Sequence, residues 1–205
     1  MADLQAHELQ AQSETEKKNP CIGIVTISDR AHSGVYTDRG GPSIISYISS
    51  NFLNNPTTKS IIIPDNFMSI TETLKSFSKT CDLILTTGGT GPAVSDVTPE
   101  ATVAVCDKEL KGFGERMRGV SVDKVPTAIL SRATAGVCGK CVVINLPGSP
   151  KAVKECLDGV IQAVPHAVRL VGGQKLELKE DAGRQISIKH KTGEDGVCEG
   201  CREKH

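Results

Sequence analysis

Three glycines, Gly88, Gly89 and Gly91, directly follow the short apolar run Leu83–Thr87. A run of this composition is typical of a strand that is buried on both faces of a parallel sheet. Because glycine has no Cβ atom, the backbone N–H groups of such a turn can approach an anion closely. Thr98-Pro99-Glu100 then predicts a helix start, with threonine as N-cap, proline at the first helical position and an acid in the first turn. The segment is therefore a candidate phosphate site.

Polar residues also follow the other predicted strands directly. They are Ser28-Asp29-Arg30 after residues 21–28, Pro64-Asp65 after residues 59–64, and Pro147-Gly148-Ser149 after residues 141–146. The carboxyl ends of parallel strands lie at one edge of a sheet, where open α/β sheets bind ligands. Glycine turns and helix N-termini favour phosphate, whereas clustered carboxylates tolerate phosphate only with a hard cation such as Mg²⁺ between them. We therefore predict a metal–nucleotide site at this edge.

Each of these features has a simpler explanation when it is taken alone. A glycine-rich turn can be only a tight turn, Asp65 can be a turn former after a proline, and Asp96 can favour the dipole of the following helix. The coincidence of four strand ends favours the ligand site. The sequence contains no P-loop, no dinucleotide-binding glycine pattern and no nucleophile elbow.

Strands alternate with helices, which predicts a three-layer α/β/α domain with a mostly parallel sheet. Helices are expected near residues 43–53, 69–78, 98–110, 113–118 and 153–171, the last one kinked at Pro165. The domain is expected to span residues 21–172. Residues 1–20 are expected to form a flexible segment, and residues 173–205 a charged, flexible tail.

Composition argues against several classes of protein. Acidic and basic residues balance at 24 each, and aromatic residues make up only 3%, which disfavours binding to nucleic acid. No apolar run approaches the roughly 20 residues that span a bilayer, and the N-terminus resembles neither a signal peptide nor a transit peptide. We therefore expect a cytoplasmic protein with no nucleic-acid or membrane partner.

The eight cysteines include two C-x-x-C pairs, Cys138/Cys141 and Cys198/Cys201. A joint zinc site is not expected, because the pairs are far apart in sequence and Cys141 begins a buried strand. The second pair with two histidines of the tail could form a Cys₂His₂ site, but reduced, unstructured thiols are the favoured interpretation. The thiols at apolar positions are expected in the core: Cys81, Cys106 and Cys156.

Four motifs together resemble one known family. They are SDRAHSGVYTDRG (28–40), TTGGTGPAVSDVTPEAT (86–102), PTAILSR (126–132) and INLPGSPKAVKEC (144–156). These motifs resemble the molybdopterin adenylyltransferases of molybdenum-cofactor biosynthesis, in particular the bacterial Mog-type enzymes, with the G domains of plant Cnx-type proteins and of gephyrin as more distant relatives. The resemblance covers about residues 21–170. It implies the molybdopterin-binding fold and the transfer of AMP from Mg-ATP to the terminal phosphate of molybdopterin, with release of pyrophosphate.

The resemblance also implies roles for individual residues. Asp65 and Asp96 match the two family aspartates that are important for adenylyl transfer, and we assign both as catalytic residues to Mg²⁺ and the triphosphate. Nucleotide binding is assigned to Gly88, Gly89, Thr90, Gly91, Ser28, Asp29 and Glu100. Molybdopterin binding is assigned to Ser131, Pro147, Gly148 and Ser149.

Ser95 departs from the family pattern, since many relatives have an arginine immediately before the motif aspartate. The role of that arginine could pass to Arg30, Arg39 or Arg132, or the affinity for the ligand could be weaker without it. The family usually assembles as trimers, and no molybdenum-insertion domain follows the last predicted helix. We therefore expect a homotrimer and a separate molybdenum-insertion protein downstream. A non-catalytic molybdopterin-binding or scaffold module is the alternative function, and the retained aspartates argue against it.

Overall fold

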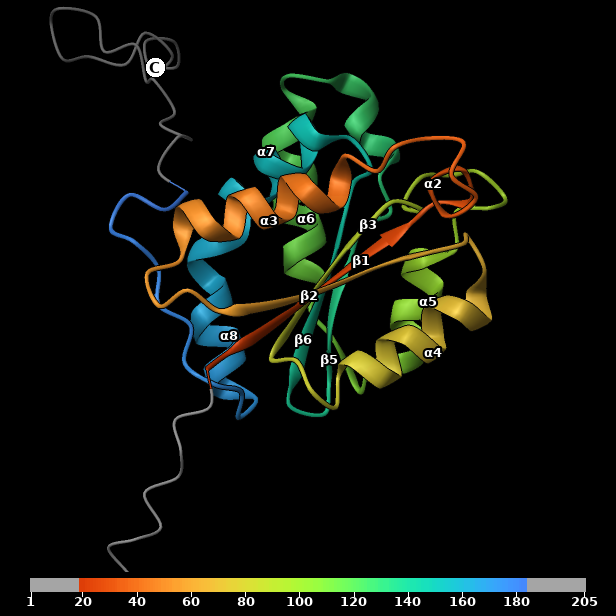
Figure 1. The fold of residues 1–205 in the computed structure, drawn as a ribbon. Coiled ribbons are helices and arrows are strands. Elements are labelled where there is room, and N and C mark those ends of the chain that lie inside the picture. The colour runs from red at the N-terminus through yellow and green to blue at the C-terminus, as the bar shows by residue number, and fades with distance from the viewer. Residues whose placement is uncertain (1–18, 184–205) are drawn as a thin grey trace, which may run out of the picture.

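The computed structural model describes residues 19–183, and in this part of the chain six strands form one sheet with the order β2-β1-β3-β6-β5-β4 (Figure 1). The strands are β1 (Cys21–Ile27), β2 (Thr57–Ile63), β3 (Leu83–Thr87), β4 (Lys108–Glu109), β5 (Ala135–Cys138) and β6 (Cys141–Leu146). Strands β2, β1, β3 and β6 are parallel, whereas β4 pairs antiparallel with β5 and β5 antiparallel with β6. The predicted α/β fold with a mostly parallel sheet is confirmed.

Helices cover both faces of the sheet and produce the three expected layers (Figure 1). They are α2 (Asp29–His32), α3 (Gly40–Asn51), α4 (Phe67–Phe77), α5 (Thr98–Val105), α6 (Lys111–Val122), α7 (Pro150–Val160) and α8 (Val164–Leu170), with 3₁₀ turns η1 (Pro126–Leu130) and η2 (Ile161–Ala163). Side chains of β1 alternate between two cores: Ile22 and Ile24 pack with α3, α6, α7 and α8, whereas Val25 and Ile27 pack with α4 and α5. A strand buried on both faces is mostly apolar, and in β1 Thr26 is the one polar side chain.

All five predicted helices have different bounds in the structure, and in two of them the difference has a clear physical reason. The helix expected over residues 98–110 ends at Val105, because the next residues turn extended and the Asp107 N–H donates to the Val137 carbonyl at 2.7 Å. The helix expected over residues 153–171 is interrupted by η2 and restarts as α8, with Pro165 in its first turn. Proline has no N–H to donate, so it is accommodated where a helix begins rather than inside one.

The prediction that Thr98 caps helix α5 is wrong. Val97 occupies the cap position and no side chain there caps the helix. The N–H of Thr98 donates to the Gly89 carbonyl at 3.1 Å, and its hydroxyl donates to the Gly88 carbonyl at 3.0 Å. Buried Thr98 therefore fastens the glycine turn to the start of α5.

Residues 173–183 pack against the domain, beyond the boundary expected at residue 172. Leu176 is 3% exposed, and Leu178 pairs with Phe52 in an isolated β-bridge. The Leu53 N–H donates to the Glu177 carbonyl at 2.8 Å. This C-terminal strap, residues 174–183, thus fastens the end of α3. Residues 1–18 and 184–205, including the second C-x-x-C pair, lie outside the described residues.

Replacing Leu176 by alanine is expected to lower the free energy of unfolding by about 2–4 kcal/mol, because its buried side chain would leave a cavity in the core. Urea denaturation followed by circular dichroism measures this change. Gln174→Ala, at an exposed position of the same strap, is the control and should stay within about 0.5 kcal/mol of the wild type. Equal stability of the two variants would show that the strap does not contribute to the core.

The cysteines of the described residues are free thiols. Cys81 and Cys156 are buried as expected, whereas Cys106 is only partly buried. Burial raises the pKa of Cys81 and of Cys106 to about 12, so both thiols stay protonated at neutral pH and are poor nucleophiles. None of the helices between residues 19 and 183 is long and apolar enough to cross a membrane.

Candidate functional site

The parallel strands place four strand ends at one edge of the sheet, as predicted. Strand β1 lies between β2 and β3, so the chain leaves β1 toward one side and returns on the other. Such a switch in strand order leaves a crevice beyond the carboxyl ends. A polar cavity of about 240 Å³ lies there, and it is lined by six of the predicted site residues: Ser28, Asp65, Gly88, Gly89, Asp96 and Gly148.

The turn after β3 requires glycine at two positions. The backbone φ angle is +101° at Gly88 and +61° at Gly89, in the left-handed region that side chains disfavour. A Cβ atom on Gly88 would lie 2.2 Å from the Ile27 carbonyl oxygen. The turn therefore packs directly on the end of β1.

The same turn presents backbone donors. The Gly88 N–H donates to the Leu146 carbonyl at 3.3 Å, so this donor is already in use. Within residues 19–183, the N–H groups of Gly89, Thr90 and Gly91 have no hydrogen-bond acceptor. Successive free N–H groups of this kind form a concave site for an anion.

Asp65 is held by the first residue of helix α2, Asp29. The Asp29 N–H donates to Asp65 Oδ2 at 2.8 Å, and the Asp65 N–H donates to Asp29 Oδ1 at 3.0 Å. Burial raises the pKa of the Asp65 carboxyl, and the charges of Asp29 and Asp96 raise it further, while the hydrogen bond from Asp29 lowers it. Asp29 thus positions Asp65 and is absent from the lining of the polar cavity.

Asp65 and Asp96 suit a hard cation. In Asp96, Oδ2 accepts the Ala93 N–H at 3.0 Å, and both aspartates line the polar cavity. Mg²⁺ prefers oxygen ligands and usually keeps one or two carboxylates with phosphate or water. Residues 19–183 contain no group of three or more His, Cys, Asp or Glu side chains that could hold a metal ion. A cation between these two aspartates would therefore take its remaining ligands from phosphate and water.

The raised pKa of Asp65 predicts a specific effect on stability. A carboxyl whose pKa is higher in the folded protein than in the unfolded chain makes folding less favourable at neutral pH, and this cost disappears as the pH falls through the folded pKa. Asp65→Asn is therefore expected to melt at a higher temperature than the wild type at pH 7, with a smaller difference at acid pH. Thermal denaturation at several pH values measures it. A lower melting temperature for Asp65→Asn at pH 7 would contradict the prediction.

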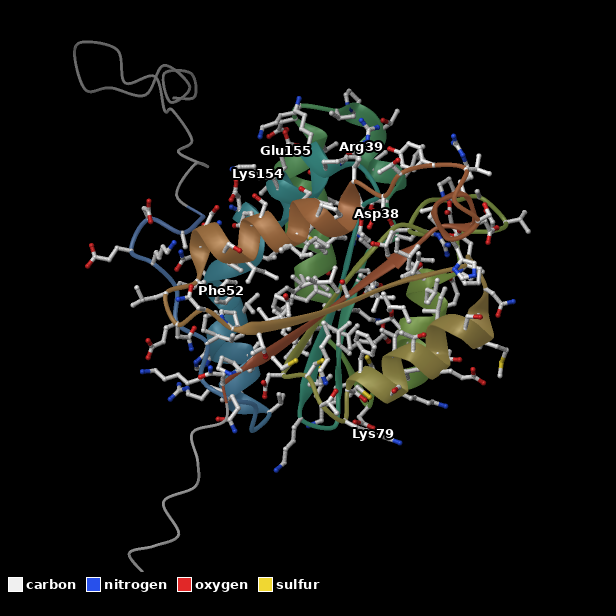
Figure 2. All side chains as sticks on the ribbon, in the orientation of Figure 1. Asp38, Arg39, Phe52, Lys79, Lys154 and Glu155 are labelled. Carbon is white, nitrogen blue, oxygen red and sulfur yellow. The ribbon has the colours of Figure 1, made fainter. Side chains whose placement is uncertain are left out.

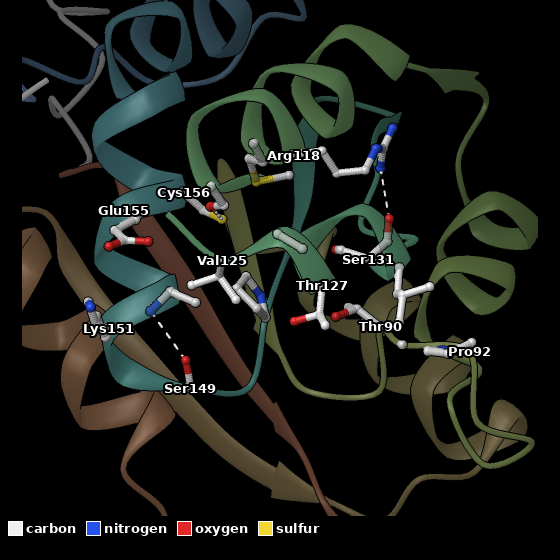
Figure 3. A pocket seen from close by; sticks show the side chains of 17 residues that line it. Thr90, Pro92, Arg118, Val125, Thr127, Ser131, Ser149, Lys151, Glu155 and Cys156 are labelled. Carbon is white, nitrogen blue, oxygen red and sulfur yellow. Dashed lines mark hydrogen bonds between the residues drawn. The ribbon is translucent and has the colours of Figure 1, made fainter. Parts of the chain in front are cut away.

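A second, mostly apolar cavity of about 360 Å³ lies beside the first (Figure 3). It is lined by five predicted residues: Thr90, Gly91, Ser131, Pro147 and Ser149. Met117, Val125 and Leu130 give it apolar walls. Ser149 caps helix α7 by accepting the Ala152 N–H at 3.3 Å, so the helix N-terminus lies at this cavity.

Two turns line both cavities. Gly88 and Gly89 face the polar cavity, whereas Thr90 and Gly91 of the same turn face the apolar one. The turn after β6 is divided in the same way, with Gly148 at the polar cavity and its neighbours at the apolar one. The Thr87 hydroxyl donates to the Pro147 carbonyl at 2.8 Å and joins the two turns. A ligand in one cavity therefore lies next to a ligand in the other.

Glu100, like Asp29, is a predicted site residue that the structure brings to neither cavity. Its carboxylate pairs with Arg132 and lines a separate hollow. Arg132 also donates from Nε to the Gly91 carbonyl at 2.8 Å and from Nη2 to the Asp96 carbonyl. Glu100 and Arg132 therefore brace the loop between the glycine turn and α5.

The sequence reasoning missed Asp38, which lines the polar cavity beside Arg39 (Figure 2). Asp38 Oδ2 accepts the Thr26 hydroxyl at 2.9 Å, and Oδ1 accepts the N–H groups of Gly40 and Gly41 at 2.9 and 3.2 Å. These bonds fix the start of α3 against the end of β1. The signal was an acid two residues before the helix start at Gly40, which resembles a capping pattern.

The parallel sheet, the glycine turn at its switch point and the paired cavities define a three-layer α/β protein with a two-part candidate site. A family model described as a probable molybdopterin binding domain matches residues 23–166. The chain belongs to this family.

Individual relatives agree with this assignment. The chain is 47% identical over 161 residues to a molybdopterin adenylyltransferase of Helicobacter pylori (strain J99), covering 78% of this chain and 92% of that protein. It is 44% identical over 170 residues to the molybdopterin adenylyltransferase of Escherichia coli (strain K12), covering 76% and 87%. Among solved structures, the molybdopterin biosynthesis enzyme MoaB from Thermus thermophilus superposes with a TM-score of 0.68 at 39% identity, covering 74% of this chain and 95% of that one.

Proposed function

We propose that this protein is a molybdopterin adenylyltransferase, which transfers AMP from ATP to the terminal phosphate of molybdopterin and releases pyrophosphate. The observation that carries the proposal is the pair of cavities that meet at the turns after β3 and β6. A transfer between two substrates needs them side by side, with the reacting atoms aligned. Relatives of this chain that bear this activity in their names are 43–47% identical to it.

In this proposal the polar cavity takes the nucleotide phosphates and the apolar cavity takes the pterin. Asp65 and Asp96 are the catalytic carboxylates and would hold Mg²⁺, which when bound neutralises charge on the triphosphate oxygens. The free N–H group of Gly89 donates to the phosphates in the polar cavity, which Ser28 also lines, and the free N–H groups of Thr90 and Gly91 follow it at the border with the apolar cavity. Pterin binding falls to the residues of the second cavity: Ser131, Pro147, Ser149 and the adjoining Gly148. Asp29 and Glu100 act on the site indirectly, through Asp65 and Arg132.

The chemistry suits this arrangement. The terminal phosphate of molybdopterin is ionised at neutral pH, so the attacking oxygen needs no strong general base. That oxygen forms a bond to the α-phosphorus of ATP, the bond from this phosphorus to its bridging oxygen breaks, and pyrophosphate leaves. The protein contributes alignment and stabilisation of charge on the phosphate oxygens.

The oligomeric state that we propose is based on the family resemblance, and the lack of a nucleic-acid partner is based on the balance of acidic and basic residues. We propose a cytoplasmic homotrimer that acts on small molecules, binds no nucleic acid and hands its product to a separate molybdenum-insertion protein. Analytical ultracentrifugation of the purified chain tests the trimer.

The full chain with molybdopterin, ATP and Mg²⁺ tests the activity. Release of pyrophosphate, together with adenylylated molybdopterin in the mass spectrum, is the expected result, and chelation of the metal should stop it. Tight binding of molybdopterin without turnover of ATP would instead favour the scaffold module.

A further inference from the structure

Arg39 is the one basic side chain among the described residues that line the polar cavity. Three carboxylates line the same cavity: Asp38, Asp65 and Asp96. Acidic groups at this density repel a polyphosphate unless cations compensate them. A bound divalent cation would compensate part of the charge, and a guanidinium is a permanent cation at any physiological pH.

Tyr36 holds Arg39 in place. Arg39 Nε donates to the Tyr36 hydroxyl at 2.7 Å, and its guanidinium carbon lies 5.4 Å from the centroid of the Tyr36 ring. The guanidinium carbon of Arg30 lies 5.3 Å from the same centroid, and the Tyr36 N–H donates to the Arg30 carbonyl at 3.0 Å. An exposed arginine that is stacked and hydrogen-bonded in this way is already oriented before a ligand arrives.

Most donors of Arg39 remain available. A guanidinium has five N–H donors in a planar fork, and Tyr36 uses the one at Nε. Within residues 19–183, Arg39 forms no salt bridge with a carboxylate. Arg132, by contrast, is engaged by Glu100 and by two backbone carbonyls. Arg39 is therefore the arginine that can replace the one missing at Ser95.

We infer that Arg39, oriented by Tyr36, binds the β- and γ-phosphate groups of ATP. The inference rests on the proposed function. Molybdopterin also carries a phosphate, but the apolar cavity has basic side chains of its own, Arg118 and Lys151. The nucleotide is therefore the partner of Arg39.

Isothermal titration of the full chain with Mg-ATP, magnesium pyrophosphate, adenosine and molybdopterin tests the inference. Arg39→Ala is expected to weaken binding of ATP and pyrophosphate by about 10- to 100-fold, since hydrogen bonds to a charged group are lost. Its affinity for adenosine and molybdopterin should stay at the wild-type value. Arg30→Ala is the matched control, because Arg30 shares the Tyr36 ring but does not line the cavity, and its affinities should change by less than about 2-fold.

The outcomes separate this inference from the proposed function. If the wild type binds pyrophosphate and Arg39→Ala binds it equally well, the inference fails while the proposed function stands. If Arg39→Ala loses affinity for molybdopterin instead, Arg39 serves the pterin phosphate and the inference is also wrong. If the wild type binds neither ATP nor pyrophosphate, both fail. Arg39→Lys keeps the charge without the planar fork, so intermediate affinity for pyrophosphate in this variant supports the inference even if the alanine variant does not fold.

Discussion

Replacing Asp96 by asparagine is expected to reduce the rate of pyrophosphate release by about 10²- to 10³-fold, while molybdopterin still binds with wild-type affinity. Asparagine keeps a side-chain oxygen that can accept the Ala93 N–H, so the loop between the glycine turn and α5 should retain its shape. Only the negative charge at the polar cavity is lost. Single-turnover release of pyrophosphate measures the rate, and titration with molybdopterin measures the affinity of the apolar cavity for molybdopterin.

A matched control for this variant is Asp107→Asn. Asp107 also accepts a backbone N–H, that of Gly139 at 2.8 Å, but it lies at the hairpin between β5 and β6, at the opposite edge of the sheet. The Asp107→Asn variant should release pyrophosphate at the rate of the wild type. Full activity of Asp96→Asn would remove Asp96 from the mechanism, and equal losses in both variants would point to a general effect of removing a carboxylate.

Replacing Gly88 by alanine is expected to lower the free energy of unfolding by about 3–5 kcal/mol and to abolish turnover. The left-handed backbone at Gly88 contributes one part of this cost, and the contact of the new Cβ with the Ile27 carbonyl oxygen contributes the other. Relief of the contact must move the turn away from β1, and the donors to the phosphates move with it. Urea denaturation measures stability, and the pyrophosphate assay measures turnover.

Gly139→Ala separates backbone strain from the steric contact. Gly139 also has a positive φ, +59°, but a Cβ atom there would meet no other atom within 4 Å. This variant should lose about 1–2 kcal/mol of stability and keep its activity. If both glycine variants lose the same stability, close packing of the turn on β1 is not what fixes glycine at position 88.

The strand ends were predictable from the sequence because each parallel strand is a short apolar run that stops at a polar residue. Strand β3 and strand β6 have the predicted bounds, and the residues after them line the two cavities. The short antiparallel strands were not predicted, since β4 has 2 residues and β5 has 4, too few for a periodic pattern. Whether β4 and β5 form strands depends on the strands beside them in the folded sheet, β5 and β6.

The missed site residue has a similar cause. Asp38 lies in an irregular loop before α3, and only the packing of α3 on β1 brings it to the cavity. Glu100 was assigned to the nucleotide from its place in a motif, but its helix turns it toward Arg132. Sequence position therefore indicated which segments form the site, whereas side-chain direction within each segment required the structure.

The C-terminal strap also has a consequence for how the chain acquires its fold. Three hydrogen bonds join the strap to the end of α3 and the following loop. The two residues in each of these pairs are separated in the sequence by 121, 123 and 130 positions. Such pairs raise the contact order, and closing long loops slows folding. During synthesis, α3 and β1 emerge long before the strap, so the C-terminal end of α3 gains its hydrogen bonds to the strap only when the last part of the domain has been made.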